Sequence, residues 1–238
     1  MYSISIENIY KSGRSVKYCN GSALSGQQLV RPLWFCSHRK LTFEIEIKLR
    51  LPGDLGKIRR KLRDAGFRVA KSRLHEYNVL LDTSTRALRG HGKLIRVRRV
   101  GTHTLLTYKG PSEQGRYKKR HEIEVVLPDA FKVEQIFSEI GYHPIFRYEK
   151  FRTEYAKPPG AGKVLLDETP IGNYLEIEGS PRWIDSTARL LGFSTADYIT
   201  RSYGYLYLAY CRERRMPAAD MLFTAKEMKQ LRKNKPNV

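Results

Sequence analysis

The stretch Phe43-Glu44-Ile45-Glu46-Ile47-Lys48-Leu49 alternates apolar and charged side chains without a break. Side chains of a β-strand point to opposite faces in turn, so the apolar residues share one face and the charged residues share the other. Pro52-Gly53-Asp54 follows and ends the strand. The stretch therefore predicts a half-buried strand whose charged side faces either solvent or the interior of a barrel.

The same alternation recurs along the chain beyond this strand. We expect further strands over 68–82, 94–100, 104–109, 118–127, 145–157, 163–168 and 174–179. Helical spacing of apolar residues predicts helices from Asp54 to Gly66, from Asp129 to Gly141, and over 181–192 and 195–210. Short turns join the strands, so the sequence predicts an α+β fold dominated by antiparallel strands.

The polar faces of these strands are almost entirely ionic. A single polar face is usually solvated, but solvated faces carry a looser mixture of side chains than this set. A closed barrel of about eight strands has room inside for side chains or one small ligand, and charges buried there need partners. We interpret the ionic faces as one barrel interior that carries Glu44, Glu46, Lys48, Arg96, Arg98, Thr107, Lys109, Lys118, Arg120, Glu122, Glu124, Lys150, Arg152, Lys163, Asp167, Glu176 and Glu178.

This residue set suits a polyanion held together with divalent metal ions. Carboxylates two residues apart on a strand project side by side, and Mg²⁺ and Mn²⁺ prefer such oxygen ligands. Arginine presents a planar fork that matches phosphate oxygens, and lysine supplies a point charge. The chain therefore carries the groups that phosphoryl chemistry needs, namely positioning and neutralisation of phosphate charge.

Composition excludes several other classes of protein. The chain of 238 residues has no apolar run long enough for a membrane span and no secretory signal pattern, and its three cysteines form no metal or disulfide pattern. The net charge is +20, but residues 1–40 and 211–238 carry half of this excess. The core segment is rich in both signs, which argues against a plain nucleic-acid face and against nucleic acid as the partner. We expect a cytoplasmic protein without a membrane partner.

Three segments follow from this pattern. We expect residues 1–40 to be a poorly ordered extension that need not belong to the native protein. Residues 41–210 should form the domain, and residues 211–238 should be a basic, solvated tail.

Six motifs in order resemble the CYTH family, also called the triphosphate tunnel metalloenzymes. The resemblance covers about residues 41–210, and Thr200–Tyr203 together with Tyr148–Arg152 look most like its bacterial class IV adenylyl cyclase branch. The motifs are Glu44-x-Glu46-x-Lys48, Arg96-Val97-Arg98, Thr107-Tyr108-Lys109-Gly110-Pro111, Arg120-His121-Glu122-Ile123-Glu124, Leu166-Asp167-Glu168 and Tyr174-Leu175-Glu176-Ile177-Glu178-Gly179.

The resemblance implies an eight-stranded antiparallel tunnel with helices packed on the outside, which binds a triphosphate with Mg²⁺ or Mn²⁺. The metal-binding residues that it implies are Glu44, Glu46, Asp167, Glu176 and Glu178, with Glu122 and Glu124 as further candidates. The implied triphosphate-binding residues are Lys48, Arg96, Arg98, Lys109 and Arg152, with Arg120 and Lys150 as additional contacts. Arg201 stands nearest to a lysine that some members carry on the C-terminal helix. The implied catalytic residues are Glu44, Glu46 and Lys48.

Three functions remain open at this point. The resemblance favours an adenylyl cyclase-like enzyme that converts ATP to cyclic AMP and pyrophosphate. A triphosphatase acting on tripolyphosphate, thiamine triphosphate or a nucleoside triphosphate would use the same phosphate-binding set. A non-catalytic module that binds polyphosphate, nucleotide or RNA is the third alternative, although such a module has no need of the carboxylates. The partner is a small triphosphate substrate in the first two cases, and a homodimer is an arrangement that the sequence leaves open.

Overall fold

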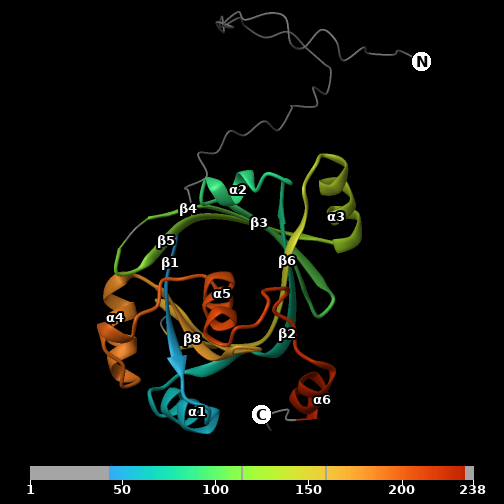
Figure 1. The fold of residues 1–238 in the computed structure, drawn as a ribbon. Helices are drawn as coiled ribbons and strands as arrows, with labels where there is room; N and C mark the ends of the chain where they lie inside the picture. Colours follow the sequence, from blue (N-terminus) through green and yellow to red (C-terminus); the bar gives the residue numbers. More distant parts are fainter. Residues whose placement is uncertain (1–42, 114, 159, 234–238) are drawn as a thin grey trace, which may run out of the picture. The chain divides into compact units, whose positions relative to one another are not determined.

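A closed antiparallel barrel forms the centre of the structure (Figure 1). The structure is a computed structural model that describes residues 43–113, 115–158 and 160–233, so the expected extension 1–40 lies outside the described residues. The eight strands follow one another around the barrel in the order β1-β5-β4-β3-β2-β6-β7-β8, and every pair is antiparallel. They are β1 (Phe43–Leu51), β2 (Arg68–Asp82), β3 (Leu94–Val100), β4 (His103–Glu113), β5 (Lys118–Leu127), β6 (His143–Ala156), β7 (Gly162–Thr169) and β8 (Gly172–Gly179). The predicted α+β antiparallel barrel is confirmed.

Helices lie around the outside of this barrel, with one exception. The helices are α1 (Leu55–Asp64), α2 (Ala87–Gly90), α3 (Ala130–Glu139), α4 (Pro181–Leu190), α5 (Tyr203–Glu213) and α6 (Ala225–Lys233), with a 3₁₀ turn over Thr195–Asp197. The predicted starts of three helices are capped: Asp54, Asp129 and Ser180 accept hydrogen bonds from main-chain N–H groups of the first turn. Helices α1, α3 and α4 lie outside the ring of strands, whereas α5 lies over its opening (Figure 1).

The outward apolar face of β1, β7 and β8 makes the main core. Ile47 of β1 and Ile177 of β8 are fully buried, and they pack in one cluster with Leu62 of α1 and Ile184 of α4. A second cluster joins β2 and β3 to α3 through Val79, Leu81 and Val97. The strand parity read from the sequence is therefore correct for β1 and β8, because their apolar sides face the helices.

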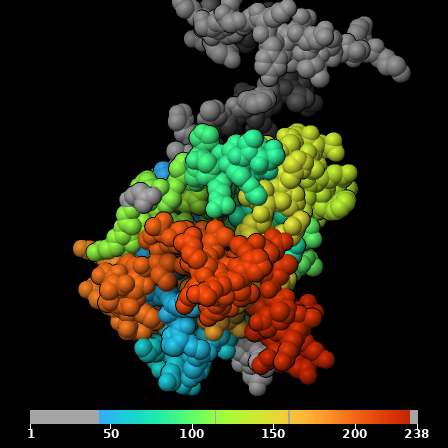
Figure 2. Space-filling view, viewed as in Figure 1, coloured from blue at the N-terminus to red at the C-terminus, as the bar shows by residue number. Residues whose placement is uncertain are grey.

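The expected helical region 195–210 is interrupted at residues 198–202. Ile199 instead forms an antiparallel bridge to β1, in which Lys48 N donates to Ile199 O at 2.8 Å and Ile199 N donates to Lys48 O at 2.9 Å. An extended backbone is required for this bridge, so α5 begins only at Tyr203, with Ser202 as its N-cap. The bridge fixes the start of α5 beside β1, and α5 covers this end of the barrel (Figure 2).

Residues 211–233 differ from the solvated tail that we expected. Met221 is 1% exposed and bridges Tyr148 of β6, donating from its N to Arg147 O at 2.9 Å and accepting from Glu149 N at 3.0 Å. Strand β7 pairs with β6 only from Phe151 onward, so the main chain around Met221 occupies the edge that β7 leaves uncovered. Helix α6 follows this contact, and residues 234–238 lie outside the described residues.

Across the described ranges, no helix is long and apolar enough to cross a membrane.

Candidate active site

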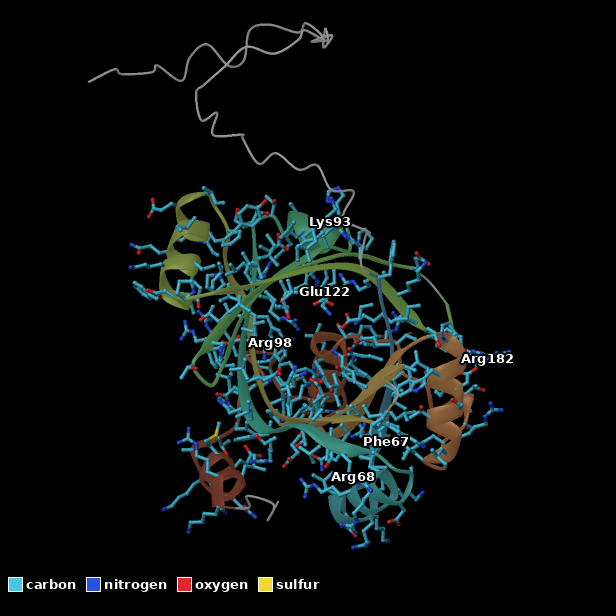
Figure 3. All side chains as sticks on the ribbon, turned by 180° about the vertical axis from the view of Figure 1, so that it is seen from behind. Phe67, Arg68, Lys93, Arg98, Glu122 and Arg182 are labelled. Carbon is cyan, nitrogen blue, oxygen red and sulfur yellow. The ribbon has the colours of Figure 1, made fainter. Side chains whose placement is uncertain are left out.

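The barrel encloses a cavity of about 240 Å³ whose wall is mainly ionic. Arg98 and Glu122 point into the space that the strands surround (Figure 3). Thirteen of the fifteen residues that the sequence assigned to the site line this cavity, whereas Asp167 and Arg201 do not. The lining residues are Glu44, Glu46, Lys48, Leu94, Arg96, Arg98, Lys109, Lys118, Arg120, Glu122, Glu124, Tyr148, Lys150, Arg152, Lys163, Glu176, Glu178, Ser202, Tyr203 and Gly204.

Three of the carboxylates form a compact group, which we call the carboxylate triad: Glu44, Glu46 and Glu178. Each offers one oxygen, and these oxygens lie within 4.8 Å of one another. The grouping follows from the sheet, because Glu44 and Glu46 are two residues apart on β1 and Glu46 is directly opposite Glu178 of β8. Oxygen donors at this spacing suit Mg²⁺ or Mn²⁺.

The charge balance around the triad supports the same reading. Burial raises the pKa of Glu178 to about 7, and the neighbouring Glu44 and Glu46 add to the effect although Lys163 opposes it. Burial disfavours the ionised form of a carboxyl, and neighbouring carboxylates disfavour it further. Lysines already contact all three carboxylates, and three oxygen donors this close together would also fit a divalent cation.

Glu46 is also the partner of two lysines. Lys48 Nζ donates to Glu46 Oε1 at 3.0 Å, and Lys118 Nζ binds the same oxygen. Burial alone would raise the pKa of Glu46, but Lys118 and Lys48 overcome it and hold the pKa far below its usual range. Glu46 therefore stays ionised and links the triad to the cations of the cavity.

A second buried carboxylate, Asp167 of β7, has a different environment. It accepts hydrogen bonds from Lys150 Nζ at 2.9 Å, Arg152 Nε at 2.6 Å and the Tyr203 hydroxyl at 2.7 Å. We call these four residues the Asp167 centre. Asp167 is fully buried and lies apart from the triad, so the structure places it as the counter-ion of two cations. A metal-binding role for Asp167 stays a prediction that these contacts do not favour.

Tyr203 connects α5 to the cations of the cavity. The Lys48 ammonium lies 5.3 Å from the centre of the Tyr203 ring and the Lys150 ammonium lies 5.2 Å from it. A cation over an aromatic face is attracted by the ring, most strongly where water is excluded. Because Tyr203 is also bonded to Asp167, it holds two lysines and one carboxylate in fixed positions.

The other carboxylates of the cavity are paired with cations along its wall. Lys109 Nζ lies 3.0 Å from Glu122, Arg96 lies 3.6 Å from Glu124, and Lys48 lies 3.1 Å from Glu176. Glu124 also accepts a hydrogen bond from the Thr107 hydroxyl at 2.7 Å. These acids keep the cations of the wall apart and oriented, and their proposed part in metal binding stays a prediction.

Arg96 has one buried hydrogen-bond donor that is unpaired among the described residues. Its Nε is buried and has no hydrogen-bond partner among the described residues, while its terminal nitrogens reach Tyr148 at 3.4 Å and Thr107 at 3.2 Å. A buried donor without a partner costs free energy, so a phosphate oxygen at this position would be stabilising.

Sequence reasoning missed the part played by β2, where the buried Glu76 and Asn78 contact cations of the wall without lining the cavity themselves. Arg98 Nε donates to Asn78 Oδ1 at 3.1 Å, and Glu76 lies 3.5 Å from Arg98 and 3.6 Å from Lys150. Burial opposes ionisation of Glu76, but Lys150 and Arg98 lower its pKa to about 2. The signal was present, because Glu76 and Asn78 alternate with the buried Val79 and Leu81, but no parity was assigned to residues 68–82.

Two predicted phosphate contacts have other partners. Arg120 donates to the main-chain oxygens of Gly110 at 2.7 Å and Gly92 at 2.8 Å, so its guanidinium supports the wall as well as lining it. Arg201 is exposed and lies over the Tyr205 ring at 4.6 Å, outside the tunnel cavity. Lys118 and Lys163 line the cavity as the strand parity predicted, although neither was given a metal- or phosphate-binding role.

The closed ring and its ionic interior define a tunnel-shaped antiparallel barrel protein. The chain belongs to the CYTH domain family, which matches residues 42–203. Members of this family are adenylate cyclase-like or triphosphatase enzymes that depend on metal ions.

Individual relatives agree with this assignment. A protein of Methanocaldococcus jannaschii, provisionally named an adenylate cyclase, is 30% identical over 148 residues, which are 62% of this chain and 83% of that protein. A provisionally named adenylate cyclase from Vibrio parahaemolyticus shares the fold with a TM-score of 0.62 at 19% identity, over 70% of this chain and 98% of that one. A structure from Hippeastrum, described as having a dominant triphosphatase activity, shares it with a TM-score of 0.54 at 19% identity, over 70% and 96%.

Proposed function

We propose that the chain is a metal-dependent enzyme that binds a triphosphate in the tunnel and converts ATP to cyclic AMP and pyrophosphate, as a class IV adenylyl cyclase does. The observation that carries this proposal is the meeting of two sets of groups in one cavity. The carboxylate triad suits a divalent cation, and the cations of the same wall suit phosphate. A protein that only binds polyanions would have no use for the triad.

The cations of the wall would hold the phosphates. In the free protein Lys48, Lys109 and Lys150 are paired with carboxylates. Phosphate oxygens entering the cavity compete for these cations, and the metal offsets the carboxylates of the triad. Arg96 adds its buried Nε–H as a donor that has no other described partner.

The reaction is a displacement at the α-phosphorus. The ribose 3′-oxygen forms the new bond to phosphorus and its proton passes to solvent, while the bond to the oxygen that bridges to the β-phosphorus breaks and pyrophosphate departs. A bound Mg²⁺ or Mn²⁺ neutralises charge that develops on the phosphate oxygens. The residues of the chain supply position: the cations of the wall fix the phosphate chain, and the Asp167 centre keeps Lys150 and Arg152 aligned.

A triphosphatase is the second candidate. All the charged groups of the cavity are of a kind that recognises phosphate and metal, and the Hippeastrum structure is described as having a dominant triphosphatase activity. The same wall would then direct water at a terminal phosphorus.

Product analysis separates these functions. The purified chain is incubated with Mn²⁺ or Mg²⁺ and either ATP or tripolyphosphate, and the products are resolved by chromatography. Cyclic AMP with pyrophosphate supports the cyclase, and release of orthophosphate supports the triphosphatase. Binding of either compound without turnover would overturn the proposed function and leave a non-catalytic sensor.

A further inference from the structure

A second hollow adjoins the tunnel where α5 begins. It has a volume of about 360 Å³, and we call it the α5 mouth. Lys118, Arg120 and Ser202 line both this hollow and the tunnel cavity, so the two spaces adjoin at these side chains. The α5 mouth is therefore within reach of a group attached to phosphates that lie in the tunnel.

The wall of the α5 mouth offers a flat stacking surface. Tyr205 is 51% exposed, and the Arg201 guanidinium lies 4.6 Å from the centre of its ring. Aromatic rings and guanidinium planes are the surfaces on which nucleic-acid bases stack. Hydroxyl groups of Ser112 and Thr200 line the same hollow and can donate or accept hydrogen bonds.

The charge of the α5 mouth also limits the kind of ligand that it can bind. Its charged lining consists of Lys118, Arg120 and Arg201 together with Glu113, and Glu113 is already paired with Lys119 at 2.9 Å. A neutral heterocycle joined to an anionic phosphate suits such a basic lining. A cationic heterocycle would be repelled by it.

A third hollow, on the side of the carboxylate triad, has the opposite character. It has a volume of about 810 Å³, and we call it the acidic mouth, because its described lining holds one lysine and five glutamates: Glu44, Glu122, Glu124, Glu154 and Glu178. Two of these belong to the triad. The two ends of the tunnel are thus unequal, and a base with its phosphates is better matched at the α5 mouth.

The start of α5 adds to this polarity. Ser202, Tyr203 and Gly204 line the tunnel cavity, so the N-terminal end of an 11-residue helix faces this cavity. The positive end of the helix dipole favours negative charge there. Phosphates would therefore lie directly beside the first turn of α5, and the group attached to them would reach the α5 mouth.

We propose that the α5 mouth binds the nucleoside of a nucleoside triphosphate, with the base stacked on the Arg201–Tyr205 pair while the phosphates occupy the tunnel. This inference rests on the proposed function and names the substrate class of the same site. Arg201, which the sequence assigned to the triphosphate, acts on the base instead.

The test compares a substrate that has a base with one that lacks it. Steady-state kinetics with Mn²⁺ are measured for ATP and for tripolyphosphate in the full chain, in Arg201→Ala and in Tyr205→Ala. The KM for ATP should rise on the order of tenfold in each variant, because one stacking surface is lost. The rate of product formation at saturating ATP and the KM for tripolyphosphate should stay the same.

Two further variants act as controls. Arg214→Ala removes a matched pair on the same helix, since the Arg214 guanidinium lies 3.9 Å from the Tyr210 ring but neither residue lines the α5 mouth. It should leave both substrates unaffected. Arg201→Lys keeps the positive charge but loses the planar stack, and it should raise the KM for ATP as Arg201→Ala does.

Each remaining result overturns the inference. An equal rise in KM for ATP and for tripolyphosphate would show that Arg201 contacts the phosphates. No change in either KM would show that the α5 mouth is not the nucleoside site. If the unmodified chain turns over tripolyphosphate but not nucleotides, the nucleoside site is refuted while a triphosphate-cleaving enzyme stands. If it turns over neither, the proposed function itself fails.

Discussion

The carboxylate triad and the Asp167 centre both hold carboxylates on strands of the same barrel, yet the residue directly across the strand pair is negative in the triad and positive in the Asp167 centre. In the triad, Glu46 lies directly opposite Glu178, so the register places like charges side by side. In the Asp167 centre, Arg152 lies directly opposite Asp167, so the register places opposite charges together. Like charges across a strand pair are destabilising and opposite charges are stabilising.

This difference teaches which carboxylates have a function beyond the fold. The Asp167 centre is complete within the chain, because each of its cations has a partner. The carboxylates of the triad are paired with lysines as well, but they lie so close together that their mutual repulsion adds to burial in raising the pKa of Glu178. Stability of the fold alone would be served by the first arrangement, whereas the second places carboxylates close together at a cost in free energy that a bound metal ion would recover.

The largest expected effect concerns turnover. Glu46→Gln and Glu178→Gln each replace one carboxylate of the triad with a neutral amide. We expect metal-dependent turnover to fall on the order of a hundredfold or more. The measurement is product formation against Mn²⁺ concentration. Glu154→Gln is the matched control, since Glu154 lines the acidic mouth but belongs to neither the triad nor the tunnel cavity, and it should keep full activity. Full activity of Glu46→Gln would remove the triad from the mechanism.

The second effect concerns the free energy of unfolding, which should fall more when the Asp167 centre is changed than when the triad is changed. Asp167→Asn leaves Lys150 and Arg152 without their shared carboxylate, and breaking a buried ion pair from one side costs about 3–5 kcal/mol. We expect this loss in the free energy of unfolding, measured by denaturant titration with a chelator present. Glu178→Gln should cost far less under the same conditions, because it relieves repulsion by Glu44 and Glu46 and loses only an ion pair with the partly exposed Lys163. Equal losses would show that the two regions do not differ as described.

The third effect is a pH dependence confined to the triad. The pKa of Glu178 is raised to about 7 from 4.5, so between these values the metal-free folded chain keeps a proton that the unfolded chain has released. Its contribution to stability is therefore present below pH 4.5 and is lost as the pH rises towards 7. Metal affinity should rise over the same range, because the proton must leave before the metal binds. Both trends, followed by denaturation and by Mn²⁺ titration, should flatten in Glu178→Gln.

The smallest effect separates the contribution of the Tyr203 hydroxyl from that of its ring. Tyr203→Phe removes the hydroxyl that donates to Asp167 but keeps the ring beneath Lys48 and Lys150. We expect a loss of about 1.5 kcal/mol in the free energy of unfolding, typical of a hydrogen bond to a charged group. Tyr203→Leu removes the ring as well and should add a rise in KM for the triphosphate. If both variants behave alike, the ring does not position the lysines.

The sequence predicted much of this arrangement because alternation is a local property. Glu44, Glu46 and Lys48 are placed on one face by the strand itself, and so are Arg96 and Arg98. The barrel followed from the number of such faces, since buried charges of both signs need one another.

The grouping of the carboxylates could not be predicted in the same way. Which of them meet depends on the register between β1 and β8 and between β6 and β7, and register is a long-range property. The family resemblance implied the same metal-binding role for Asp167 and Glu178, although their neighbours across the strand pairs carry opposite charges. The interruption of the last helical region at Ile199 was hidden for the same reason, because its cause is a bridge to Lys48.

The position of β1 has a consequence for how the chain acquires its fold. This first strand pairs with β5 and with β8, so the ring closes only after residue 179 has left the ribosome. Contacts between residues so far apart in the chain form slowly, and we expect folding in the range of milliseconds to seconds. Until that closure, the carboxylates of β1 and β8 are separate and hydrated. Metal would therefore bind late, after the last strand has joined the first.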